Sequence, residues 1–114
     1  MASVPSWVEE LEASVTVASA DGTITYLNRR ALETFKEDGG ASLIGKSLFD
    51  CHPEPARSRL REMYEVKKPN HYTISKKGLK KIIHQLPWFE AGSFAGFVEI
   101  SFVIPEAMPH FDRG

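Results

Sequence analysis

Residues 20–28 read ADGTITYLN, and they bring a turn, a short strand and a helix start close together. Asp21-Gly22 between two alternating runs predicts a β-hairpin with a type I′ turn, in which both central residues have positive φ. The β-branched and aromatic run 23–26 suits a half-buried strand. Asn28 can cap a helix by accepting hydrogen bonds from free backbone N–H groups. The stretch therefore predicts a chain that passes from a hairpin directly into a helix.

The sequence on either side extends this pattern to an α+β domain. Residues 14–19 alternate as the first strand of the hairpin, and the first helix is expected to end at Gly39-Gly40. A later helix is expected to begin at Pro55 and to end near residues 67–69. Three further strands are expected within residues 71–77, 80–90 and 94–104. Two strands, then helices, then three strands are typical of one antiparallel sheet with segregated helices.

The N-terminal segment predicts a short helix of its own. Ser6 and Glu9 have the spacing of a capping box, in which Ser6 bonds forward and Glu9 reaches back. Trp7, Val8 and Leu11 are expected on one side of this helix. A helix this short needs tertiary packing to be stable.

Composition limits the classes of protein to consider. The chain has 114 residues, 42% of them hydrophobic, which suits one domain that buries about two-thirds of its unfolded surface. A net charge of -1 gives no general attraction to nucleic acid or to anionic membranes, so neither is expected as a partner. Cys51 is the only cysteine, which excludes an internal disulfide. No run is apolar enough to span a membrane, and the first residues lack the features of a secretory signal, so a cytoplasmic location is expected.

Three segments in order resemble the PAS domain, the small sensor module of signalling proteins. They are DGTITYLN before a helix, LIGKSLFDCHPE before the next helix, and the closing strand GFVEISFVIP. The resemblance implies a five-stranded antiparallel sheet in the order 2-1-5-4-3 with helices over one face. It divides the chain into an N-terminal capping helix (1–12), a PAS domain (13–105) and a C-terminal tail (106–114). One departure is Val103-Ile104-Pro105, where the family often has Asp-Ile-Thr, a polar end that commonly couples to an effector.

The same resemblance predicts a cavity between the sheet and the helices, and a sensory or regulatory module that binds a small molecule there. On alignment with the family, Gln85, Glu99 and Ser101 face the cavity. Glu99 has two interpretations, as a polar group that orients a ligand or as a structural hydrogen-bond acceptor. The residues expected to line the cavity are Tyr26, Leu32, Phe35, Ile44, Leu48, Leu60, Met63, Ile83, Gln85, Phe97, Glu99 and Ser101.

The opposite face of the sheet is expected to be too apolar for water alone, which indicates a partner surface. We expect a homodimer in which the N-terminal helix covers part of this face and a second subunit covers the rest. In the alternative, the helix covers all of it and the protein is a monomer. An effector domain or signalling protein is a further expected partner. The residues assigned to the interface are Trp7, Leu11, Leu86, Trp88, Val98, Ile100 and Phe102.

No motif identifies a cofactor. His52 is a weak haem candidate, because some PAS domains hold haem through a helix histidine. Cys51 lacks the flanking Asn and Arg of flavin-binding relatives, and it is expected to be a buried or half-buried structural thiol. His84 is expected to pack on the outer face. Four scattered histidines without a helical i, i+4 pair predict no metal site.

Two other functions fit the sequence. One is a ligand-free interaction module that pairs through the outer sheet face. The other is a small enzyme that uses Glu99 as a base, but it needs a second acid–base group, and His84 is expected to face away. The chain has no phosphate loop, nucleophile elbow or metal-binding HExxH motif, and no enzyme activity is expected.

Overall fold

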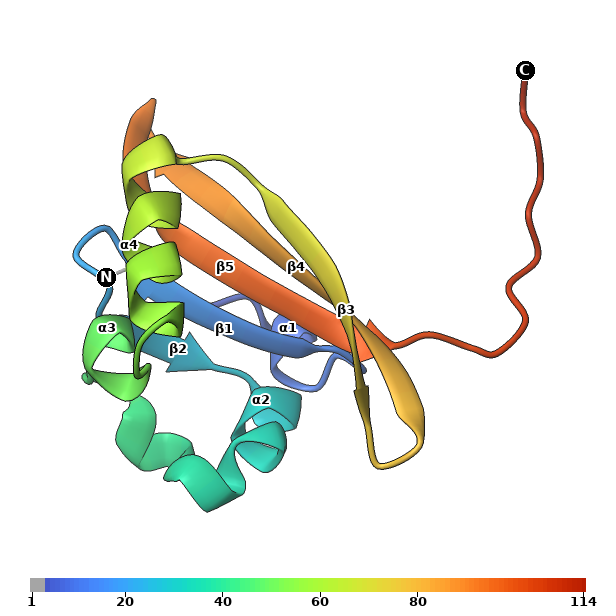
Figure 1. The fold of residues 1–114 in the computed structure, drawn as a ribbon, viewed down its shortest axis with the longest axis horizontal. Coiled ribbons are helices and arrows are strands. Elements are labelled where there is room, and N and C mark those ends of the chain that lie inside the picture. The colour runs from blue at the N-terminus through green and yellow to red at the C-terminus, as the bar shows by residue number, and fades with distance from the viewer. Residues whose placement is uncertain (1–3) are drawn as a thin grey trace.

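The structure, a computed structural model that describes residues 4–114, contains a five-stranded antiparallel sheet. Its strand order is β2-β1-β5-β4-β3, which confirms the predicted topology (Figure 1). The first two and the last three strands meet where β1 pairs with β5. The strands are β1 (Ser14–Ser19), β2 (Ile24–Leu27), β3 (Asn70–Lys76), β4 (Leu79–Glu90) and β5 (Ser93–Val103).

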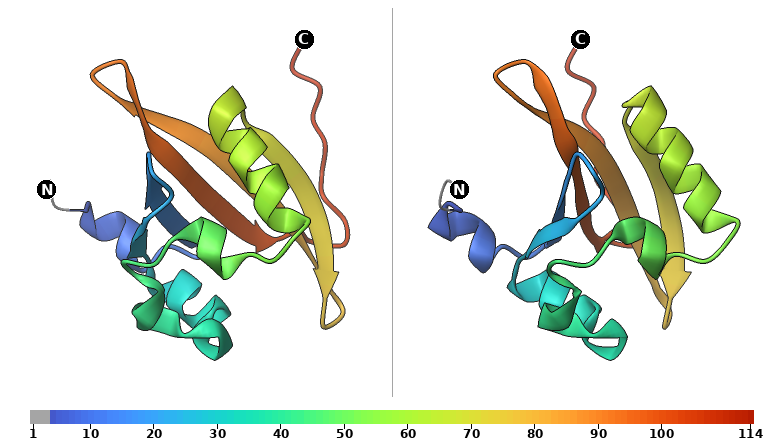
Figure 2. Two further views of the ribbon diagram at one scale, coloured as in Figure 1. Left: turned by 60° about the vertical axis from the view of Figure 1, so that its left-hand side comes forward. Right: turned by 90° about the vertical axis from the view of Figure 1, so that its left-hand side faces the viewer.

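The helices lie on both sides of the sheet but unequally. The segment between β2 and β3 packs over one face, which we call the helix face, whereas α1 lies on the other, the open face (Figure 2). No helix of residues 4–114 is long and apolar enough to cross a membrane. The helices are α1 (Ser6–Glu9), α2 (Arg29–Thr34), η1 (Lys36–Asp38), η2 (Gly40–Leu43), α3 (Leu48–Cys51) and α4 (Ala56–Val66).

The β1–β2 turn differs from the one predicted. Gly22 has a φ of +86°, but Asp21 is not among the residues with positive φ, so this is not a type I′ turn. The Asp21 carboxylate instead accepts hydrogen bonds from the backbone N–H of Thr23 and the hydroxyl of Ser19, which stabilises a longer loop. Ser19 Oγ and Asp21 are 2.5 Å apart, and this bond lowers the pKa of Asp21.

The type I′ pattern occurs instead at the two later hairpins. Lys77 and Gly78 both have positive φ between the paired ends of β3 and β4. Ala91 and Gly92 do the same between β4 and β5. The turns predicted at Gly78 and Gly92 are confirmed, and their short loops fix the register of the three long strands.

Asn28 caps α2 as predicted, and it also joins three parts of the chain. Its side chain is fully buried, and Oδ1 accepts hydrogen bonds from the N–H groups of Ala31 and Val15, each at 3.0 Å. Its Nδ2 donates to the carbonyl oxygens of Val8 and Ala13, each at 2.9 Å. One amide therefore holds α1 and the segment after it against β1 and α2.

The predicted capping box is wrong. Pro5 is the N-cap of α1, and no side chain caps this helix. Ser6 is already the first helical residue, and Glu9 accepts a hydrogen bond from the hydroxyl of Tyr26 on β2 instead. Val8 is buried, whereas Trp7 is 68% exposed, so α1 shields only part of the open face.

Gly96 allows β1 and β5 to approach closely at one point. A Cβ on Gly96 would lie 1.9 Å from the carbonyl oxygen of Ala18, and the φ of Gly96 is +140°. From there the register runs without a break from Ser19↔Gly96 to Ser14↔Ser101. This pairing places Thr16 directly opposite Glu99.

Candidate functional site

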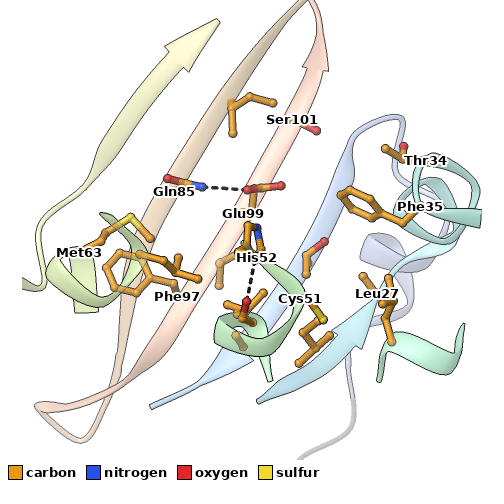
Figure 3. A pocket seen from close by; sticks show the side chains of 18 of the residues that line it. Leu27, Thr34, Phe35, Cys51, His52, Met63, Gln85, Phe97, Glu99 and Ser101 are labelled. Carbon is orange, nitrogen blue, oxygen red and sulfur yellow. Dashed lines mark hydrogen bonds between the residues drawn. The ribbon is translucent and has the colours of Figure 1, made fainter. Parts of the chain in front are cut away.

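A cavity of about 310 Å³ lies between the helix face and the helical segment (Figure 3). Pockets that hold small organic ligands start at about this size. The sheet forms one wall through all five strands, and α2, η2, α3 and α4 contribute the other. Most of the surface is apolar, with a few polar side chains among it.

Nine of the twelve residues predicted to line the cavity do so. They are Phe35, Leu48, Leu60, Met63, Ile83, Gln85, Phe97, Glu99 and Ser101. The alternation along β4 and β5 separated their side chains into two sets, and the resemblance to PAS domains indicated which set faces the cavity. Their role in binding stays a prediction.

Three expected residues lie elsewhere. Tyr26 pairs with Val17 on the open face, where its hydroxyl contacts Glu9. Leu32 packs against the small core formed by Ile24, Leu27 and Ala31. Ile44 is 46% exposed and follows the end of η2, where the next residues, Gly45 and Lys46, hydrogen-bond to the backbone of Ile24 at the edge of the sheet.

A chain of hydrogen bonds crosses the sheet wall of the cavity. Asn70 Nδ2 donates to Gln85 Oε1 at 2.8 Å, and Gln85 Nε2 donates to Glu99 Oε2 at 3.0 Å. Because Asn70 occupies the amide oxygen, Gln85 must present its NH₂ group to the carboxylate. Glu99 has no cation within 4.0 Å among residues 4–114, so its charge is not balanced by an ion pair.

Thr16 adds a polar atom that the sequence analysis missed. Its Oγ1 is buried, lines the same cavity and has no hydrogen-bond partner in the described chain. A buried hydroxyl without a partner costs free energy that a bound group can recover. The pairing of β1 with β5 would have found this residue, since Thr16 lies opposite Glu99.

His52 enters the cavity from the end of α3. Its Nδ1 lies 2.6 Å from the carbonyl oxygen of Leu48. Because a carbonyl oxygen only accepts, Nδ1 carries a proton and Nε2 is the ring nitrogen left for a second partner. Cys51 precedes it and is exposed, which corrects the expectation of a buried or half-buried thiol.

The outer edge of the cavity also includes side chains of β3. Tyr72, which pairs with Ile83, lines the cavity together with Ile74 and Lys76. Burial, followed by the nearby Glu99 carboxylate, raises the pKa of Tyr72. A second hollow of about 630 Å³ between α4 and β3 shares Tyr72 and Gln85 with the cavity. It therefore adjoins the polar wall at Gln85.

Aromatic rings close the end of the sheet away from these polar groups. Tyr64 on α4 makes edge or tilted contacts with Phe49, Phe94 and Phe97, at centroid distances of 5.3, 5.9 and 5.0 Å. Burial, followed by the charge of Asp21, raises the pKa of Tyr64 to about 12. This cluster gives α4 a firm attachment to the sheet.

The open face carries the residues assigned to an interface. Leu86 pairs with Val98 and His84 with Ile100, so these side chains share one side of the sheet. Phe102 is 43% exposed, and Leu11 is 38% exposed. Trp88 folds back, and its Nε1 donates to the carbonyl oxygen of Ala18 at 3.2 Å.

His84 lies on the open face as predicted. Its Nδ1 is 2.8 Å from Nδ1 of His71, the residue opposite it on β3. No group of three or more potential metal-binding side chains occurs within residues 4–114.

The strand order, the helices over one face and the cavity between them define the PAS class of α+β domain. A family model described as the PAS fold matches residues 8–66. The chain therefore belongs to the PAS family. A search of curated protein sequences gave no match.

Solved structures agree with this assignment. The PAS domain of the histidine kinase ThkA has a TM-score of 0.61 and 23% identity, over 81% of this chain and 99% of that chain. A C-terminal domain from Streptococcus mutans has a TM-score of 0.69 and 19% identity, over 84% and 78%. The Aer2 receptor from Vibrio cholerae, described as a dual PAS-heme oxygen sensor, has a TM-score of 0.62 and 16% identity, over 82% and 95%. At these identities the likeness concerns the fold.

Proposed function

We propose that this chain is a sensory PAS module of signal transduction that binds a small organic molecule in the cavity between sheet and helices. One observation carries the proposal: an apolar cavity of about 310 Å³ contains a hydrogen-bonded Gln85–Glu99 pair and the unpartnered hydroxyl of Thr16. A few fixed polar groups in an apolar enclosure are typical of sites that orient a ligand. Membership of the PAS family supports the same function.

Transmission would use the other side of the same strands. A ligand on the helix face that repacks β4 and β5 also moves Leu86, Val98 and Ile100 on the open face. We propose that this face forms a homodimer or binds an effector, and that binding biases that interface. The ligand shifts the equilibrium between the two arrangements of this interface only by the difference in its affinity for them. In this proposal the module is cytoplasmic and has no catalytic role.

The apolar open face also favours a second candidate, a ligand-free interaction module. Trp7, Leu11 and Phe102 are exposed there, and such patches mark partner surfaces. The two functions differ in whether the cavity holds a molecule in the purified protein.

Native mass spectrometry of protein purified from its expression host tests both candidates, followed by denaturation and an absorbance scan. A released small molecule, or a haem or flavin band, supports the sensory module and identifies its chemical class. A protein that carries no molecule and has twice the chain mass favours the interaction module.

A pair of variants ties the result to the cavity. Ser101→Phe places a ring in the cavity, and it is expected to remove the bound molecule. Ile100→Phe adds the same ring one position away on the open face, and it should leave the molecule in place. Loss of the molecule from both variants would contradict the assignment to the cavity.

A further inference from the structure

We infer that the cavity selects ligands with a positively charged hydrogen-bond donor, such as an amine or amidine, on a small apolar body. This inference rests on the proposed function and specifies the chemistry of that site. It follows from the number of acceptors in the cavity, and from the absence of a cation near Glu99.

Glu99 is the principal acceptor. It is half-buried, and Gln85 occupies only one of its two oxygens, at 3.0 Å from Oε2. A carboxylate can accept about four hydrogen bonds. No Lys, Arg or His nitrogen lies within 4.0 Å of it in the described part of the chain. A cationic ligand would supply both the missing donors and the missing charge.

The polar groups around Glu99 favour the same class of ligand, one with several N–H donors. Nδ1 of His52 is engaged by the Leu48 carbonyl oxygen, which leaves Nε2 as the ring nitrogen available to a ligand. Thr16 Oγ1, opposite Glu99 in the β1–β5 register, has no partner and can also accept. Figure 3 shows Glu99, on β5, and His52, at the end of α3, among the residues that line one cavity. A group with several N–H donors can serve these acceptors together, which a carboxylate ligand cannot do.

Two lysines also line the cavity, and their positions keep them away from this acceptor group. Lys81 pairs with Val103, and Lys76 pairs with Leu79, so both belong to the hairpin end of the sheet. Lys81 is four residues from Gln85 along β4, which corresponds to about 13 Å of extended strand. The positive charges therefore lie at one end of the cavity and Glu99 in its middle.

Three probes with the same ring test the inference: benzylamine, benzyl alcohol and benzoate. Titration calorimetry with the full chain is expected to give benzylamine at least tenfold tighter binding than benzyl alcohol, and benzoate the weakest binding. Glu99→Gln is expected to reduce the preference for benzylamine at least fivefold and to leave benzyl alcohol unchanged. Glu90→Gln, the same substitution at the exposed end of β4, is the control and should retain the preference.

The outcomes separate the two proposals. Binding of benzyl alcohol that Ser101→Phe abolishes, without a preference for benzylamine, would overturn the charge selection and leave the ligand site standing. A preference for benzylamine that Glu99→Gln does not reduce would also overturn it. If none of the probes binds at millimolar concentration, the charge selection is overturned, whereas the ligand site itself is decided by the native mass spectrum of the purified protein.

Discussion

Along β5, neighbouring residues face opposite sides of the sheet, and the two sides differ in an instructive way. On the helix face, beneath the helical segment between β2 and β3, lie Glu99 and Ser101, which are polar. On the open face, with only α1 nearby, lie Val98, Ile100 and Phe102, which are apolar. A stable isolated domain is expected to have the reverse arrangement. In the proposed function, a polar ligand completes the helix face and an apolar partner completes the open face.

The largest expected effect on stability comes from the close approach of β1 and β5 at Gly96. Gly96→Ala would bring a Cβ within 1.9 Å of the Ala18 carbonyl oxygen, at a φ that disfavours any side chain. We expect the free energy of unfolding to fall by more than about 4 kcal/mol in denaturant titrations.

Gly45→Ala is the control for Gly96→Ala. Its φ is +93°, but a Cβ there meets no atom within 4 Å, so only backbone strain remains. Equal losses for the two variants would mean that the close approach of β1 and β5 contributes nothing.

The second effect concerns the attachment of α1, the one helix that residues 4–114 place on the open face. Asn28→Ala removes four hydrogen bonds from a fully buried position and leaves their backbone partners unsatisfied. The expected loss of stability is about 3 kcal/mol. Hydrogen exchange should show that the amides of α1 lose protection first.

Asn28→Asp separates the two parts of this role. It keeps the acceptor for Ala31 and Val15 but removes the donor to Val8 and Ala13. It should release α1 while the start of α2 stays protected. Equal loss of protection at both places would contradict this division.

A third prediction tests the open face directly. Phe102→Glu places a charge on the proposed interface, and it is expected to weaken dimerisation at least tenfold, about 1.4 kcal/mol, as measured by analytical ultracentrifugation. Phe89→Glu is the matched control, because Phe89 is 54% exposed and pairs with Phe94, whose ring packs against Tyr64 of α4 on the helix side of the sheet. Equal weakening by both variants, or a monomeric starting protein, would contradict the proposed dimer.

The smallest expected effect is a change in the pKa of a tyrosine, and it is tested by comparing one tyrosine on each face of the sheet. Burial raises the pKa of both Tyr64 and Tyr26 to about 12, with Asp21 and Glu9 respectively as further causes. Glu9→Gln should therefore lower the pKa of Tyr26 and leave that of Tyr64 unchanged, as read from phenolate absorbance.

The effect on stability has a defined sign. The native state holds these protons more tightly than the unfolded chain, whose tyrosines titrate near 10. The free energy of unfolding should therefore fall as the pH rises from about 10 through 12. Tyr64→Phe should reduce this dependence, and an unchanged pH profile would contradict the burial of the hydroxyl.

The sequence predicted the strand order through its resemblance to PAS domains, and it predicted the two faces of β4 and β5 through their alternation. It failed where a side chain had more than one available partner. Glu9 could cap its own helix or bond Tyr26, and only the packing of α1 on the sheet decided between them. The Asp21 carboxylate likewise bonds Ser19 and Thr23, which favours a loop other than the two-residue turn.

The sequence by itself determined most of the elements, their order and which strand residues share a side of the sheet, because these depend on local periodicity. The tertiary structure decided which distant groups share the cavity. Thr16, His52 and Tyr72 come from three separate segments, and no local pattern connects them with Glu99. The pairing of β1 with β5 and of β3 with β4, together with the placement of α3, brings them together. Such contacts depend on strand register and helix packing across the whole chain.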